Sequence, residues 1–409
     1  MSRHRLSDIR LLFAARIVRL FAYGFLSVVL VLYLSAAGLD KEHIGLLLSL
    51  TLVGDVLMSL YLTTRADVFG RRRTLVAGAA LMFLAAVAFA VTRDFTLMLL
   101  AATIGVISPS GNEVGPFLAV EQVALAQLAG ARDRTSLFAW YNLSGSFATA
   151  CGALAAGAFT TRLMRGGFTA VASYRVVIAG YALLGIVMAL LFLRVSRAVE
   201  NPNDAASGAP PAAKSLFRIS ASRDVVTRLS ILFAVDSFAG GLVVQSIVAY
   251  WFFHHFRASP ALIGSIFFGA NILAGISALA AARIARRIGL LKTMVFTHLP
   301  SNVLLLLVPF MPTLPLAIAV LLLRFSISQM DVPTRQSYVI AVVDPSERTA
   351  AAGITGVART TGAALAPVIA MPLIAGMRSW IPFVAAGVLK IGYDLVLLHG
   401  ARRHTMPDD

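Results

Sequence analysis

The chain is 409 residues long; 58% of the residues are hydrophobic, 13% are charged, and the formal net charge is +16. Soluble globular domains carry about a quarter charged residues, so this composition excludes an ordinary soluble enzyme. The apolar content likewise excludes a disordered chain. The class that remains is a protein that crosses a membrane many times.

Twelve stretches are long and apolar enough to cross a bilayer as helices, which takes about 20 residues each. The sequence therefore predicts an all-α membrane protein with both chain ends on the same side. The predicted transmembrane helices are residues 11–34, 43–64, 74–92, 96–120, 136–161, 174–194, 226–253, 261–284, 293–311, 314–340, 350–376 and 381–400.

Most Lys and Arg residues fall in the loops on the side of the N-terminus, for example at 71–73 and 283–292. Cytoplasmic loops of membrane proteins carry such an excess, so we expect both termini in the cytoplasm. The membrane topology then accounts for the net charge, and no nucleic-acid partner is expected. The compact loops favour a multi-pass protein of a bacterial inner (plasma) membrane.

A polar, proline-rich segment from Asn201 to Lys214 predicts a linker after the sixth span. We expect a six-helix bundle at 1–194, a cytoplasmic linker at 195–225 and a second six-helix bundle at 226–409. The halves repeat each other weakly, because short matches such as Gly70–Thr74 with Gly289–Thr293 recur at a near-constant offset. Two pseudo-symmetric halves around a central site are a transporter architecture.

The turn after the second span, residues 66–73, reads Ala-Asp-Val-Phe-Gly-Arg-Arg-Arg. Its glycine permits a tight turn, and Asp67 could cap a helix N-terminus. In this position the turn resembles the signature loop of the major facilitator superfamily: a Gly, three residues, Asp-Arg, one residue, then Gly-Arg-Arg. Thr63 and Val68 depart from that pattern.

The resemblance implies the twelve-helix fold of that superfamily and a conformational latch that stabilises the outward-facing state. In this latch Arg71 pairs with an acid near the cytoplasmic end of the fourth span. The fifth span has Gly145, Gly152 and Gly157 but no proline, unlike many drug–proton antiporters, so the subfamily is not assigned. The implied latch residues are Asp67, Gly70, Arg71, Arg72 and Glu121.

The fourth span contains two prolines and two glycines between Ser108 and Pro116, which predicts a broken helix facing a cavity. Glu113 and its neighbour Asn112 lie in this break, and a desolvated glutamate can carry a proton. Asp331 in the tenth span occupies the repeat position of Glu113. Its alternative role is a neutral pair with Arg335, one turn later on the same helix face.

Other charges inside the predicted spans are candidates for binding solute or protons, because such groups are costly in a membrane. Arg19 and Asp236 occupy equivalent positions in the two halves and could form a bridge or clamp a charged solute. For Asp55, Asp236 and Arg359 a purely structural role is equally open. We read Lys390 and Asp394 as a structural pair, and Cys151 as a buried, inert thiol.

The sequence has no phosphate-binding loop, nucleophile–base set or metal-ligand set, so we expect no enzyme activity, cofactor or metal. We expect a monomeric secondary active transporter, embedded in lipid, that moves a small polar or amphiphilic solute. A proton gradient is the expected driving force, with efflux or antiport favoured. The alternatives are a proton-independent facilitator and a non-transporting membrane sensor.

Overall fold

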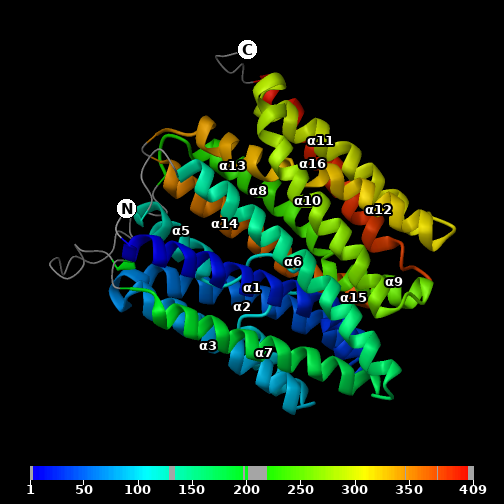
Figure 1. The fold of residues 1–409 in the computed structure, drawn as a ribbon. Helices are drawn as coiled ribbons and strands as arrows, with labels where there is room; N and C mark the ends of the chain where they lie inside the picture. The colour runs from blue at the N-terminus through cyan, green and yellow to red at the C-terminus, as the bar shows by residue number, and fades with distance from the viewer. Residues whose placement is uncertain are drawn as a thin grey trace. The chain divides into compact units, whose positions relative to one another are not determined.

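The computed structural model describes residues 3–128, 134–196, 199–200, 219–345, 347–374 and 376–403. Within these ranges the regular structure is helical and contains no strand (Figure 1). The helices are α1 (Arg3–Ala36), α2 (Lys41–Phe69), α3 (Arg71–Val91), α4 (Phe95–Ile104), α5 (Phe117–Leu128), α6 (Arg134–Arg165), α7 (Ala170–Arg194), α8 (Arg223–Gly241), α9 (Gln245–Phe256), α10 (Pro260–Ile288), α11 (Leu290–Leu307), the short 3-10 helix η2 (Val308–Phe310), α12 (Leu314–Ser328), α13 (Asp331–Val342), α14 (Arg348–Leu365), α15 (Pro367–Ile374) and α16 (Ile381–Arg403).

These helices confirm the predicted all-α membrane fold. Eleven single or joined helices in the described part are long and apolar enough to cross a membrane. The remaining predicted span, 96–120, consists of the shorter apolar helices α4 and α5, separated by the non-helical residues 105–116. The break expected there is therefore confirmed. The tenth span is also interrupted, between Ser328 and Asp331, which the sequence analysis did not predict.

The chain forms two compact units, one of Met1–Pro211 with Val248–Phe268 and one of Ala212–Ile247 with Gly269–Asp409. In the first unit α1 packs against α6 and α7, and α3 packs against α7. In the second, α8 packs against α14, and α11 packs against α16. Residues 201–218 of the expected linker lie outside the described residues, so the boundaries drawn from that linker remain predictions.

Two glycine turns show the internal repeat in the backbone. Gly70 separates α2 from α3 with φ at 92°, and Gly289 separates α10 from α11 with φ at 85°. Glycine adopts this conformation at little cost. The hydroxyl groups of Thr74 and Thr293 donate back to the carbonyls of these two glycines, at 3.0 and 2.7 Å. The same turn therefore recurs at equivalent positions in the two halves.

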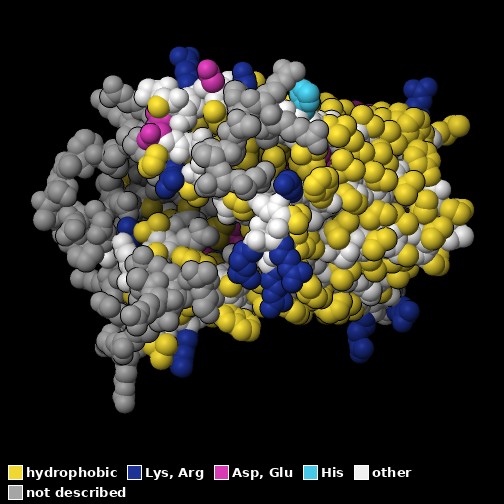
Figure 2. All heavy atoms as spheres, turned by 90° about the horizontal axis from the view of Figure 1, so that it is seen from above, with side chains coloured by type: hydrophobic (Ala, Val, Ile, Leu, Met, Phe, Trp, Pro, Cys, Tyr) yellow, Lys and Arg dark blue, Asp and Glu magenta, His cyan; other side chains and the backbone are white. Residues whose placement is uncertain are grey.

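Hydrophobic side chains cover a broad area of the surface in Figure 2, and Lys and Arg side chains stand mostly around it. Large apolar residues are exposed on many helices, including Leu57, Leu183 and Ile231. A surface of this kind suits lipid rather than water.

Cys151 in α6 is exposed, so the prediction of a buried thiol was wrong. It lies one residue, and about 100° around the helix, from the face that packs on α1.

Helices α1 and α6 approach so closely that only glycine fits at the contact. A Cβ atom on Gly152 would stand 2.0 Å from the carbonyl oxygen of Phe21, and one on Gly24 would stand 2.1 Å from that of Thr149. Small residues let helix backbones meet in this way in membranes. The glycines of the fifth span thus serve helix packing.

We expect Gly152→Ala to lower the free energy of unfolding by about 1–3 kcal/mol, because the added methyl group forces the two backbones apart. The measurement is the melting temperature of the detergent-purified protein. Gly356→Ala is the matched control, since a Cβ at Gly356 meets no heavy atom within 4 Å. An equal loss of stability in both variants would contradict the close-packing explanation.

Candidate functional site

Two arginines of α1 meet two acids of the broken fourth span inside the first unit. Arg19 donates from Nε to Glu113 at 2.6 Å, and from Nη1 and Nη2 to the two carboxylate oxygens of Glu121 at 2.7 and 2.6 Å. Arg16 donates to Glu113 at 3.0 Å and to Asn142 at 3.2 Å. The side chains of Arg19 and Glu121 are fully buried, whereas that of Glu113 is 15% exposed.

Aromatic rings enclose these charges. The guanidinium of Arg16 lies 4.2 Å from the ring centroid of Tyr141, and that of Arg19 lies 4.8 Å from the ring centroid of Phe117. The hydroxyl of Tyr141 also donates to Glu121. Every oxygen of Glu121 thus has a donor, and a buried ion pair needs such full pairing to offset its loss of hydration.

The predicted latch pair of Arg71 with Glu121 was wrong. Glu121 is occupied by Arg19, while Nη1 of Arg71 donates to the side-chain oxygen of Gln127 at 2.8 Å. The reason lies in the geometry of α5. Gln127, further along the same helix, is the residue that reaches α3, whereas Glu121 faces α1.

The turn at Gly70 is secured by an acid that the sequence analysis missed. Glu200 accepts hydrogen bonds from the backbone N–H groups of Arg71 at 2.7 Å and Arg72 at 3.1 Å, and so caps the N-terminus of α3. Asp67 lies in the last turn of α2, and its side chain is outside the described part of the chain, so its predicted capping role remains a prediction. No local pattern signals Glu200, since it is distant in sequence.

Asp55 in α2 has no basic partner among the described residues. Its carboxylate accepts from the backbone N–H of Gly115 at 2.5 Å and from the hydroxyl of Ser59 at 3.3 Å. Gly115 belongs to the broken stretch of the fourth span, two residues after Glu113. Asp55 therefore joins α2 to the break, where Asn112 is exposed.

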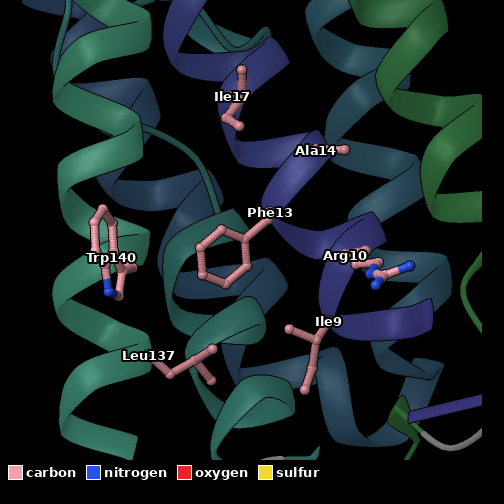
Figure 3. A pocket seen from close by; sticks show the side chains of 7 residues that line it. All are labelled: Ile9, Arg10, Phe13, Ala14, Ile17, Leu137 and Trp140. Carbon is pink, nitrogen blue, oxygen red and sulfur yellow. The ribbon is translucent and has the colours of Figure 1, made fainter. Parts of the chain in front are cut away.

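A hollow of about 600 Å³ lies between α1 and α6 (Figure 3). The ring of Phe13, in its wall, packs edge-on against Tyr141 with centroids 5.3 Å apart. Tyr141 in turn contacts the guanidinium of Arg16, so a single ring separates Phe13 from that charge. The lining residues are Ile9, Arg10, Phe13, Ala14, Ile17, Leu137 and Trp140.

The second unit contains its own buried charge cluster around Asp236 of α8. Asp236 accepts from Lys390 at 2.7 Å and from Arg335 at 3.1 Å. Arg335 also pairs with Asp331 at 3.0 Å, as the spacing in the tenth span suggested. The neutralising pair with Arg335, which was the alternative to a functional role for Asp331, is thus formed.

A second part of this cluster joins α11 to α16. Nδ1 of His298 lies 2.9 Å from Asp394, and Asn302 donates to the other oxygen of Asp394 at 3.0 Å. The predicted pair of Lys390 with Asp394 was therefore wrong, because the two side chains point to different neighbouring helices. The sequence analysis assigned His298 no role, since its acidic partner is far along the chain.

Arg19 and Asp236, for which a mutual bridge was one of the two alternatives, each pair with a residue of their own unit. The repeat nevertheless appears in these contacts. In the first unit Arg19 on the first helix pairs with Glu113 of the fourth span. In the second unit Asp236 pairs with Arg335 of the tenth span, so the charges are exchanged between equivalent helices. Arg359 makes no described hydrogen bond or ion pair, and its Nε atom is buried.

A carboxylate of the second unit also fastens a helix terminus outside the predicted membrane spans. Glu347, just before α14, accepts from the backbone N–H groups of Ser220 at 2.7 Å, Ser222 at 2.8 Å and Ala221 at 3.0 Å, at the start of α8. The hydrogen bond from Ser220 is the largest of the causes that lower the pKa of Glu347 to about 2. Glu347 thus stabilises the start of α8 in its charged form.

We expect the wild type to lose more stability than Glu347→Gln between about pH 5 and pH 2. An ordinary glutamate has a pKa of about 4.3, so Glu347 contributes fully above that value and loses its contribution as the pH falls toward 2. The measurement is the melting temperature of both proteins across this range. Glu42→Gln, at an exposed residue, is the control; a pH profile of Glu347→Gln that parallels the wild type would contradict the prediction.

Comparison with known proteins identifies the fold family. The model of the Major Facilitator Superfamily matches residues 12–367. The chain belongs to the major facilitator superfamily. It is 31% identical over 416 residues to the uncharacterized membrane protein YJR124C of Saccharomyces cerevisiae (strain ATCC 204508 / S288c), with 95% of this chain and 93% of the relative covered.

Solved structures of superfamily transporters share this fold. The nucleoside transporter NupG is 14% identical with a TM-score of 0.73, covering 97% of this chain and 99% of its own. The xylose transporter XylE from E. coli, in a partially occluded inward-open conformation, is 15% identical with a TM-score of 0.72, covering 97% and 98%. These similarities confirm the expected superfamily fold and indicate a membrane transporter.

Proposed function

We propose that this superfamily member is a secondary active transporter that couples a proton gradient to the movement of a small polar or amphiphilic solute. Asp55 is the proposed proton carrier, and Glu113 is the second candidate. The observation that carries the proposal is the position of Asp55, a carboxyl group in a membrane helix with no basic partner among the described residues. Export in exchange for protons is the favoured direction.

Protonation of Asp55 is linked by geometry to the break in the fourth span. A lone carboxylate inside a membrane is costly, and binding a proton removes that cost. The N–H of Gly115 favours the charged form, so loss of this hydrogen bond and uptake of a proton go together. Residues 105–116 are not held by helical hydrogen bonds. A movement of this stretch that breaks the hydrogen bond from Gly115 would therefore raise the affinity of Asp55 for a proton.

Glu113 and Arg16 suit solute binding at the same break. Glu113 forms ion pairs with the guanidinium groups of Arg16 and Arg19, and it is the most exposed of these three side chains. A solute that offers its own polar group could replace one of these contacts without leaving a buried charge unpaired. The adjoining hollow would hold the apolar part of an amphiphilic solute.

Asp55→Asn tests the coupling. Proteoliposomes are offered a panel of amino acids, organic acids, sugars and cationic drugs, and uptake is followed by mass spectrometry. The variant should lose accumulation driven by a pH gradient while still exchanging solute at equal concentrations on both sides. Asp94→Asn, outside the spans, is the matched control. Accumulation by Asp55→Asn with the pH profile of the wild type would remove Asp55 as carrier, and the same result with Glu113→Gln would remove the second candidate.

A proton-independent facilitator is the alternative, and it would equilibrate solute without accumulation. A membrane sensor would move no solute at all. We further propose a monomer with both termini in the cytoplasm and a site in a bacterial inner (plasma) membrane. The support for this orientation is the excess of Lys and Arg in the loops on the N-terminal side.

A further inference from the structure

The three buried acids inside the described spans of the second unit, Asp236, Asp331 and Asp394, each have a polar partner. Asp236 binds Lys390 and Arg335, and Asp331 binds Arg335. Asp394 is held by the imidazole of His298 and the amide of Asn302. Within the described part of these helices, no buried carboxylate is left without a hydrogen-bond or ion-pair partner.

Two arginines in the same unit have no such partner. Arg324 in α12 and Arg359 in α14 make no described hydrogen bond or ion pair, and the Nε atom of each is buried without a partner. Arg324 lies only over the ring of Phe325, 5.0 Å from its centroid. Both stand more than two helical turns from either end of their candidate spans, Leu314–Val342 and Ala350–Ile374.

These two arginines lie near the same charges. Both interact electrostatically with Asp236 and Asp331, and Arg359 is also repelled by Arg335. The hydroxyl of Ser328, one turn after Arg324, is likewise buried without a hydrogen-bond partner. Arg324 and Ser328 thus supply donors without a described acceptor in the helical turn before the break of the tenth span.

Unpaired guanidiniums at this depth are costly, and the fold gains no described hydrogen bond or ion pair from them. We infer that Arg324 and Arg359 bind the anionic group of the transported solute, a small organic carboxylate or phosphate. A planar guanidinium binds either group through two parallel hydrogen bonds, and the hydroxyl of Ser328 adds a further donor. The inference rests on the proposed function in taking the bound anion to be the solute that is moved.

Anion binding is measured by thermal stabilisation of the full chain in detergent. The probes are succinate, pyruvate, inorganic phosphate and glycerol phosphate, with uncharged succinamide and cationic putrescine as chemical controls. We expect at least one anion to raise the melting temperature with a saturable dose dependence. Arg324→Gln and Arg359→Gln should each weaken its affinity about 10- to 100-fold, the range for a charge-assisted hydrogen bond.

Arg175→Gln is the matched control. Arg175 also lies in a membrane helix with a buried, unpartnered Nε, but it belongs to the first unit, so its replacement should change the affinity less than twofold. Without anion, Arg324→Gln and Arg359→Gln should melt at or above the wild-type temperature, because no acid loses its partner. Arg→Lys at either position keeps the charge but loses the two-pronged contact, and should weaken binding less than Gln does.

Two results would overturn the inference: no anion stabilises the wild type, or an anion stabilises the Gln variants as well as the wild type. The proposed function can fail separately. If an anion binds through these arginines but proteoliposomes move no solute, the site stands and transport fails. If proteoliposomes accumulate only neutral or cationic solutes, and no anion binds, transport stands and the anion site is wrong.

Discussion

Replacing Arg19 with methionine is expected to lower the free energy of unfolding by roughly 3–5 kcal/mol, the cost of removing one partner from a buried ion pair. The substitution leaves both oxygens of Glu121 without their guanidinium, in a site with no access to solvent. Glu113 loses its shorter contact with Arg19 as well. The measurement is the melting temperature of detergent-purified protein, together with its yield as a monodisperse species.

Arg16→Met is the control for this prediction and should be milder. Glu113 then keeps Arg19, and the other partner of Arg16, Asn142, is uncharged. The double variant Arg19→Met with Glu121→Leu should recover stability relative to Arg19→Met alone, because one stranded carboxylate is removed. If Arg19→Met melts within 1 °C of the wild type, the buried cluster is not what secures α1 to the fourth span.

The corresponding prediction for the second unit is Asp236→Asn, with an expected loss of roughly 3–5 kcal/mol. Asp236 is the acid shared by Lys390 and Arg335, and an asparagine leaves two buried cations with the single carboxylate of Asp331 nearby. The melting temperature reports the loss. The fraction of Asp236→Asn that remains folded should bind solute as the wild type does.

Asp394→Asn makes a close comparison, because its partners are the imidazole of His298 and the amide of Asn302. Neither partner is permanently charged, so we expect the smaller loss of a hydrogen bond, about 1–3 kcal/mol. Equal losses from Asp236→Asn and Asp394→Asn would show that the sharing of Asp236 by two cations does not determine stability.

The sequence predicted those features of the fold that depend on local composition. Apolar stretches of sufficient length became the spans, and the prolines and glycines of 108–116 became the break between α4 and α5. The matching sequences at Gly70 and Gly289 predicted equivalent turns, and both glycines adopt the same positive-φ conformation. The break before Asp331 was missed, although Pro333 lacks the N–H that would bond to the carbonyl of Gln329, which lies in the break.

Partners across the bundle could not be predicted in the same way. Helical periodicity identifies the face on which a charge lies, but the packing of helices decides which neighbour it meets. Lys390 and Asp394 share a helix face one turn apart, yet Lys390 bonds to α8 and Asp394 to α11. Glu121 was assigned to Arg71 by family resemblance, whereas the direction of α5 presents it to Arg19.

The structure divides the intramembrane charges into two sets with different expected roles. One set is paired and buried, as around Arg19 and Asp236, and its removal should affect folding. The other lacks a described charged partner and includes Asp55, Arg324 and Arg359. Because the fold does not depend on pairing them, their removal should affect transport more than stability.

Solute accumulation by the wild type in proteoliposomes under an imposed pH gradient tests the central claim most directly. The account predicts uptake against a concentration gradient that an uncoupler abolishes. Uptake that only reaches equilibrium and is unaffected by the uncoupler would contradict proton coupling and establish the facilitator instead.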